Sequence, residues 1–252
     1  MRTAAICLTT ILLLVGCAAP PAANVKKKAT PVPVRTPIMP EAVTIDKQTN
    51  VSFSSYSKDW PVDWQWIDPD EKYSPTQHDT KKGVLRVVIP TGKDLNLEVR
   101  NSPRYLKPIK GDFQIETRVK FLPGENYQGA GLLIQKDGNN FIRFQRAFGG
   151  EGGGGGGLML DALRGEEHIP LASTADIPTD TPEVELRIVR SGRLFIAYWR
   201  EDEDGEWREA GEFESDYPET VQAGVTVSNT AREVTAEFAY IRLLPGITEQ
   251  GK

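Results

Sequence analysis

Three tryptophans stand close together in the segment DWPVDWQWIDP, at positions 60, 64 and 66. The apolar face of an indole ring can stack on the C–H face of a sugar, and its N–H can donate to a hydroxyl. If this piece of chain is extended, Trp64 and Trp66 point to the same side, because the side chains of a strand alternate. The pair predicts a sugar-stacking surface, and closure of a hydrophobic core is the alternative.

Planar polar side chains form a second candidate set on three successive strand-like segments. The first segment carries Glu116 and Arg118, the second Gln135, and the third Arg143 and Gln145. If these strands are neighbours, Arg118 and Arg143 are expected on adjacent strands of a concave sheet, on the same non-core face. Such groups could bind vicinal hydroxyls or the carboxylate of an acidic sugar. The alternative is an ordinary solvated β face.

The remaining chemistry-bearing residues form no catalytic or metal-binding set. His78 and His168, the only histidines, lie in polar, turn-like segments and are predicted to be surface residues. The acidic run at 201–206 is predicted to be a solvated hairpin tip, with a calcium-binding loop as the alternative. No catalytic residue, metal ion or other cofactor is therefore predicted.

The elements that must position these side chains are β-strands. Residues 112–121, DFQIETRVKF, alternate between apolar and polar side chains, and residues 83–89, 183–190 and 221–227 are also strand-like. Turn signals such as Ser-Gly and Asp-Gly separate the strands, and no helical period of useful length is present. The pattern predicts an all-β, antiparallel sandwich that forms one domain over residues 43–245.

Four segments resemble, in order, the concanavalin A-like lectin/glucanase superfamily: residues 101–121, 128–144, 186–207 and 221–243. Within that superfamily they are similar to the C-terminal β-sandwich of family 43 glycosidases and to related bacterial domains of unknown function. The resemblance implies a jelly-roll β-sandwich on a fold that hosts lectins, hydrolases and spacers alike. Laminarinase-like members carry their catalytic carboxylates as Glu-x-Asp-x-x-Glu, and this sequence lacks that string.

These observations predict a non-catalytic carbohydrate-binding module, not an enzyme, whose partner is a glycan or a glycosylated surface. Two alternatives stay open: a structural or protein-interaction domain of the cell envelope, and a divergent glycoside hydrolase. The net charge of −5 gives no basic surface, so no nucleic-acid partner is predicted.

A dense glycine run, FGGEGGGGGGLML, occupies positions 148–160. A phosphate loop needs a following helix, and the residues after the run instead read as a strand. The run is predicted to be a mobile loop between neighbouring strands, with a functional lid as the alternative.

The N-terminus is predicted to be a lipoprotein signal peptide, residues 1–16. An apolar stretch ends in LVGC at positions 14–17, which resembles a lipobox and implies lipidation of Cys17. A disordered Pro/Lys-rich linker would follow over residues 17–42, and residues 246–252 would form a C-terminal tail. The protein is thus expected to be exported and lipid-anchored to the bacterial membrane, the outer membrane if the bacterium is Gram-negative.

Overall fold

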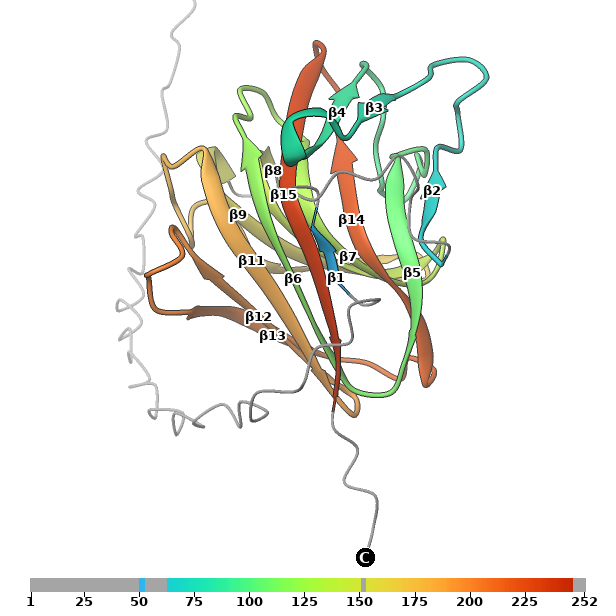
Figure 1. Cartoon of the computed structure of the whole chain (residues 1–252), viewed down its shortest axis with the longest axis vertical. Coiled ribbons are helices and arrows are strands. Elements are labelled where there is room, and N and C mark those ends of the chain that lie inside the picture. The colour runs from blue at the N-terminus through green and yellow to red at the C-terminus, as the bar shows by residue number, and fades with distance from the viewer. Residues whose placement is uncertain (1–49, 53–62, 151–152, 247–252) are drawn as a thin grey trace, which may run out of the picture. The chain divides into compact units, whose positions relative to one another are not determined.

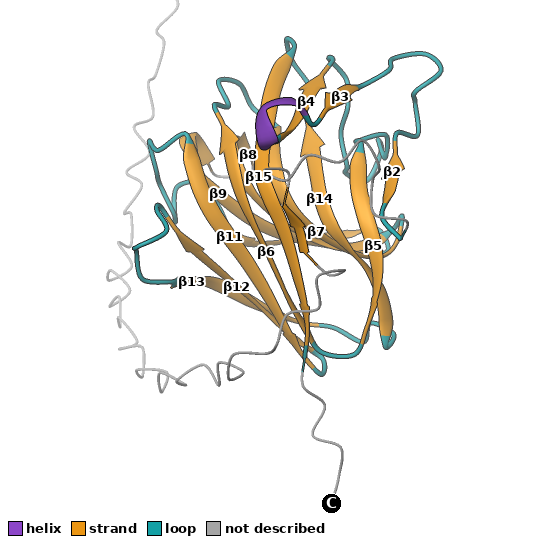
Figure 2. Ribbon diagram, viewed as in Figure 1, coloured by secondary structure: helices purple, strands orange, loops and turns teal. Residues whose placement is uncertain are grey.

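The computed structural model describes residues 50–52, 63–150 and 153–246, and nearly all of their regular structure is β-strand (Figure 2). These residues belong to one unit that spans residues 40–252. The strands are β1 (Asn50–Ser52), β2 (Gln65–Ile67), β3 (Gln77–Asp79), β4 (Leu85–Ile89), β5 (Arg104–Lys110), β6 (Phe113–Phe121), β7 (Gln128–Asp137), β8 (Asn140–Gly150), β9 (Gly153–Arg164), β10 (Glu167–Ala172), β11 (Glu183–Ser191), β12 (Leu194–Arg200), β13 (Arg208–Glu214), β14 (Thr220–Ser228) and β15 (Val234–Pro245). One short 3-10 helix, η1 (Lys81–Gly83), precedes β4.

The strands form two antiparallel sheets (Figure 1). The eight-stranded sheet has the order β13-β12-β11-β6-β15-β4-β3, and β1 also pairs with β15. The seven-stranded sheet has the order β10-β9-β8-β7-β14-β5-β2. The predicted all-β, antiparallel sandwich is therefore confirmed. The predicted signal peptide, Cys17 and the linker lie outside the described residues, and no described helix has the length and hydrophobicity needed to cross a membrane.

The main hydrophobic core contains the apolar side chains that alternate along the strands. On β6, Phe113, Ile115 and Val119 are at most 2% exposed, as the period-two pattern predicts. Thr117 shares this buried face, and its hydroxyl donates to the carbonyl of Tyr240, 2.7 Å away. The bond satisfies a polar group that would otherwise be buried without a partner.

A second, smaller hydrophobic cluster lies on the other face of the seven-stranded sheet. It consists of Leu95, Leu106, Leu133, Phe141 and Leu163. Leu95 comes from the long connection between β4 and β5, residues 90–103, so this connection packs over the sheet. The sheet is thus covered on both faces where the connection crosses it.

Ion pairing and backbone bonds hold this connection in place. Lys93 is fully buried and its ammonium lies 2.7 Å from the buried carboxylate of Asp68. The backbone of Lys93 also exchanges two hydrogen bonds with that of Asn229, at 2.9 and 2.6 Å. Because a buried charge without a partner is costly, the Lys93–Asp68 pair keeps the β4–β5 connection attached to the segment that follows β2.

The glycine run forms most of a β-hairpin, so its prediction as a loop is wrong. Strand β8 continues to Gly150 and β9 begins at Gly153, with Phe148 opposite Gly156 and Ala147 opposite Gly157. The hairpin joins neighbouring strands, as expected, but only residues 151–152 lie outside the described strands. Position 157 requires glycine, because a Cβ there would overlap the backbone of Thr174, which follows β10.

Candidate functional site

A cavity of about 280 Å³ lies on the outer face of the seven-stranded sheet. Its strand-borne lining comes from β7, β8, β9, β10 and β14, and residues 94 and 96–98 of the β4–β5 connection line it as well. Small-molecule sites usually measure roughly 300–1,000 Å³, so this cavity is slightly smaller than that range. It suits a compact ligand.

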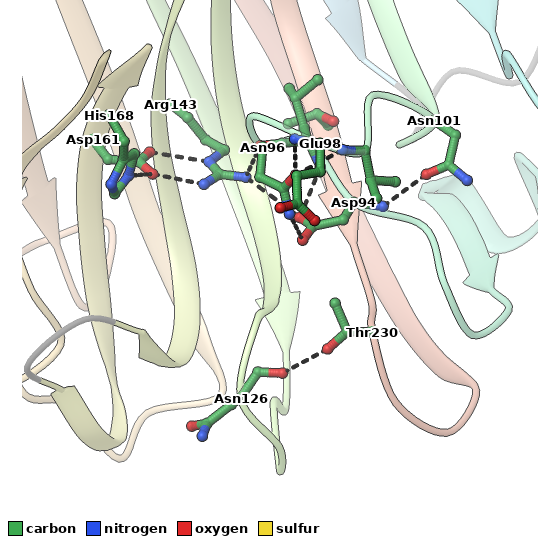
Figure 3. Close-up of polar contacts among 12 residues, drawn as sticks. Asp94, Asn96, Glu98, Asn101, Asn126, Arg143, Asp161, His168 and Thr230 are labelled. Atoms are coloured by element: carbon green, nitrogen blue, oxygen red, sulfur yellow. Dashed lines mark hydrogen bonds and ion pairs between the residues drawn. The ribbon is translucent and has the colours of Figure 1, made fainter. Parts of the chain in front are cut away.

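An ion pair between β8 and β9 forms part of the polar lining (Figure 3). Arg143 and Asp161 are directly opposite in the strand register. The guanidinium binds the carboxylate with both prongs: Nε lies 3.0 Å from Oδ1 and Nη2 lies 2.6 Å from Oδ2. Its remaining nitrogen, Nη1, donates to the carbonyl of Leu95 at 2.9 Å. Arg143 therefore ties the sheet to the connection that covers it.

The Asp161 carboxylate also contacts His168 on β10, where Nε2 lies 3.0 Å from Oδ2. Burial alone would raise the pKa of Asp161, but the charge of Arg143 and the bonds from Arg143 and His168 lower it to about 2. Burial raises the pKa of Asp94, a neighbour in the lining, although Arg143 opposes that effect. Asp161 is thus ionised at neutral pH.

Gln145 lines the same cavity and has no hydrogen-bond partner among the described residues. Its side chain is 0% exposed, and neither its amide nitrogen nor its oxygen is bonded. The amide lies over Gly129, where a Cβ would come within 2.6 Å of Gln145 Oε1. Since an unmade bond of a buried polar group costs about 1–3 kcal/mol, this donor and acceptor are candidates for binding a ligand.

Tyr127 borders the cavity and is 56% exposed. Its φ of 63° is uncommon for a residue other than glycine. Its neighbour Asn126 accepts a 2.9 Å hydrogen bond from the hydroxyl of Thr230 (Figure 3), and Gln128 Nε2 donates to Asn229 Oδ1 at 3.1 Å. These bonds on either side hold Tyr127 in position at the rim.

Asn96 shapes the opposite part of the lining. Its Oδ1 accepts from the backbone N–H groups of Glu98 and Val99, both at 2.8 Å, and its Nδ2 donates to Asp94 at 2.6 Å (Figure 3). Such side-chain-to-backbone bonds are typical of tight polar turns. They place Glu98, an exposed acid, at the edge of the cavity.

The structure separates the five predicted polar residues into two sheets. Gln135, Arg143 and Gln145 share the outer face of the seven-stranded sheet, but Gln135 does not line the cavity. Glu116 and Arg118 lie on β6 in the eight-stranded sheet. The expected adjacency of Arg118 and Arg143 is wrong, because the chain crosses from one sheet to the other between β6 and β7.

Glu116 and Arg118 instead take part in ion pairs within their own sheet. The Glu116 carboxylate is held by Arg187 at 2.6 Å and by Arg242 at 2.9 Å. Arg118 pairs with Glu183 at 2.5 Å. Their charged groups are therefore engaged by neighbouring strands, away from the cavity.

Trp64 and Trp66 pack against the core and do not line the cavity. Trp64 is 5% exposed and stacks on Tyr105, with ring centroids 5.0 Å apart. Trp66 is half-buried against the same core, and its ring lies 4.0 Å from that of His78. Trp60 lies outside the described residues. Trp64 and Trp66 therefore match the alternative prediction, closure of the hydrophobic core, and they form no exposed stacking surface.

Asp161, Tyr127 and Glu98 line the cavity but are not among the residues predicted from the sequence, and His168, predicted to be a surface residue, lines it as well. A signal for Asp161 was present, because a single carboxylate interrupts the apolar run LMLDAL at 158–163. A lone acid in a buried strand usually has a partner. Across the described ranges, no group of three His, Cys, Asp or Glu side chains is arranged to hold a metal ion.

A family model described as a protein of unknown function (DUF1349) matches residues 73–245. No curated protein matches the sequence. The fold is similar to that of a functionally unknown protein from Saccharomyces cerevisiae, with a TM-score of 0.61 and 13% identity, over 74% of this chain and 98% of the other.

Two further solved structures connect the fold with carbohydrate-related proteins. The GH43 protein BlXynB from Bacillus licheniformis matches with a TM-score of 0.62 and 18% identity, over 84% of this chain but 42% of its own length. The exoplasmic/lumenal domain of VIP36, in a Ca2+/Man2-bound form, matches with a TM-score of 0.54 and 10% identity, over 82% and 91% of the two chains. At such identities the likeness shows the fold, a concanavalin A-like sandwich, and the predicted resemblance is confirmed at that level.

Proposed function

The chain belongs to the DUF1349 family of proteins of unknown function, and we propose that its sandwich is a non-catalytic carbohydrate-binding module. The observation that carries the proposal is the buried Gln145 amide, which lines a cavity and lacks any partner among the described residues. An amide offers a donor and an acceptor side by side, which matches two vicinal sugar hydroxyls.

The rest of the cavity suits the same ligand. Tyr127 supplies an exposed aromatic ring at the rim, and Phe148 and Met159 add apolar surface. A sugar ring has apolar C–H faces and a polar edge, so it can stack on an aromatic ring while its hydroxyls bond to the floor. Arg143 and Asp161 contribute by fixing the strands and the covering connection, since they bind each other.

Lectin-like neighbours support this proposal at the level of fold. The VIP36 domain is described as Man2-bound, and BlXynB is described as a GH43 protein, of which this chain covers 42% of the length. Fold alone does not assign a ligand, so the proposal depends on the cavity.

Substituting Tyr127 with alanine tests the proposal. Exposed aromatic anchors contribute strongly to binding, so Tyr127→Ala is expected to weaken retention on a polysaccharide, or a glycan identified on an array, at least tenfold. Its melting temperature should change little, because the ring is mostly solvent-exposed. Tyr73→Ala is the matched control, since Tyr73 is 80% exposed and does not line the cavity. Equal retention by both variants would exclude this cavity as the binding site.

We further propose that the protein is exported and anchored to the membrane by lipidation of Cys17. The sequence LVGC at positions 14–17 supports this proposal. Cys17→Ser is expected to abolish incorporation of a palmitate analogue and to release the protein from the membrane fraction, because the attachment thiol is removed. Continued labelling of the variant would contradict the anchor.

A further inference from the structure

The charged side chains that line the cavity are mostly acidic. Asp94, Glu98 and Asp161 contribute carboxylates, whereas Arg143 contributes the one lining guanidinium in the described part of the chain. Because Arg143 pairs with Asp161, the carboxylates of Asp94 and Glu98 leave the lining with a formal excess of acidic groups. Charges that surround a small ligand select its sign through the field that they create.

Arg143 is not available to an anionic ligand. Both prongs of its fork bind Asp161, at 3.0 and 2.6 Å, and Nη1 donates to the carbonyl of Leu95 at 2.9 Å. Its side chain is 8% exposed. Binding the carboxylate of an acidic sugar would require this buried pair to open, which is costly.

Glu98, in contrast to Arg143, has a charged group that is available to a ligand. Its backbone N–H is held by Asn96 Oδ1 at 2.8 Å, which fixes the residue at the edge of the cavity (Figure 3). Its carboxylate makes no hydrogen bond or ion pair with another described residue, and the side chain is exposed. An acceptor with negative charge is thus open to a ligand.

The unpartnered Gln145 amide is the independent sign that a ligand enters this cavity. Because it needs both a donor and an acceptor, it favours a ligand with neighbouring polar groups. An uncharged hydroxyl pair satisfies Gln145, and a cationic group satisfies Glu98.

We propose that the cavity selects a glycan unit that carries a protonated amino group beside its hydroxyls, that is, an amino sugar with a free amine. This inference rests on the proposed carbohydrate binding and adds the charge of the ligand. In this arrangement the ring stacks at Tyr127, the hydroxyls reach Gln145, and the ammonium pairs with Glu98.

The test compares four soluble oligosaccharides of equal length by calorimetric titration of the full chain. They are chitosan oligomers with free amines, their N-acetylated chitin counterparts, neutral cello-oligomers and anionic oligogalacturonate. At low salt the chitosan oligomer is expected to bind about fivefold more tightly than the neutral ones, the size of an exposed ion pair, and oligogalacturonate should bind most weakly. Added salt should reduce the preference.

Glu98→Gln is expected to remove the preference for the amine while it keeps the affinity for the cello-oligomer. Glu206→Gln is the matched control, because Glu206 is exposed on the β12–β13 connection and does not line the cavity. Equal affinity for all four oligomers, or a preference of the Glu98→Gln variant for chitosan, would overturn the inference and leave carbohydrate binding intact. Failure of all four oligomers to bind would overturn the carbohydrate proposal itself, and the inference with it.

Discussion

Replacing Asp161 with alanine is expected to lower the free energy of unfolding by about 3–5 kcal/mol. The substitution leaves the guanidinium of Arg143, itself 8% exposed, without its carboxylate partner. It also removes the acceptor of His168. Urea unfolding of the wild type and the variant, followed by tryptophan fluorescence, measures the difference.

The double variant Arg143→Met with Asp161→Leu is the control for this prediction. Replacing a whole buried ion pair with apolar residues of similar size is often neutral or stabilising, so the double variant should recover most of the lost stability. A loss below about 1 kcal/mol for Asp161→Ala alone would contradict the role of the pair, because that is the size of a surface salt bridge.

The same ion pair should make stability depend on acid pH. The folded pKa of Asp161 is lowered to about 2 from an ordinary 3.8, so the folded state favours its ionised form. The contribution of Asp161 to the free energy of unfolding is fully present above the ordinary pKa and is lost as the pH falls through the folded pKa. This loss corresponds to about 2 kcal/mol between pH 4 and pH 2. The double variant should lose less stability across this window.

Gln145→Met is expected to weaken glycan binding more than tenfold, or about 1.4 kcal/mol, without loss of stability. The two unmade hydrogen bonds of the buried amide cost free energy in the unliganded protein. Methionine is unbranched, adaptable and apolar, so it can fill the same space without this cost. The free energy of unfolding should stay the same or rise by about 1 kcal/mol, while calorimetric titration shows the loss of affinity.

Gln135→Met is the matched control for this substitution. Gln135 is 9% exposed, lies on the same face of the same sheet and also has an unpartnered Oε1, but it does not line the cavity. The Gln135→Met substitution should leave glycan binding unchanged. If Gln145→Met destabilised the fold by more than about 1 kcal/mol, the amide would have a structural role that contradicts its assignment to a ligand.

The strands and their core faces could be predicted because alternation is a local property of the chain. In DFQIETRVKF the apolar positions are buried between the sheets, as the period of two requires. Predicted strands at 183–190 and 221–227 match β11 and β14 to within one residue at each end. The family resemblance and the sandwich architecture follow from these local patterns in sequence order.

The candidate site could be predicted only in part. Arg143 and Gln145 were identified as planar polar groups on an outward face, and both line the cavity. Trp64 was assigned to binding because a tryptophan suits either a sugar or a core, and sequence pattern does not separate the two. The position of the glycine run between two strand-like segments predicts a loop, whereas the close packing of Gly157 against Thr174 requires glycine within a strand here.

Local alternation is enough to specify which side chains of each strand point inward, since sterics makes neighbouring residues alternate. The sheet that each strand joins, and so whether two outward side chains meet, depends on long-range packing. Arg118 and Arg143 are separated because consecutive strands β6 and β7 lie in different sheets. Arg143 and Asp161 meet because the β8–β9 register sets them opposite each other. Alternation specifies a face but no neighbour, and pairing depends on contacts between residues distant in the chain.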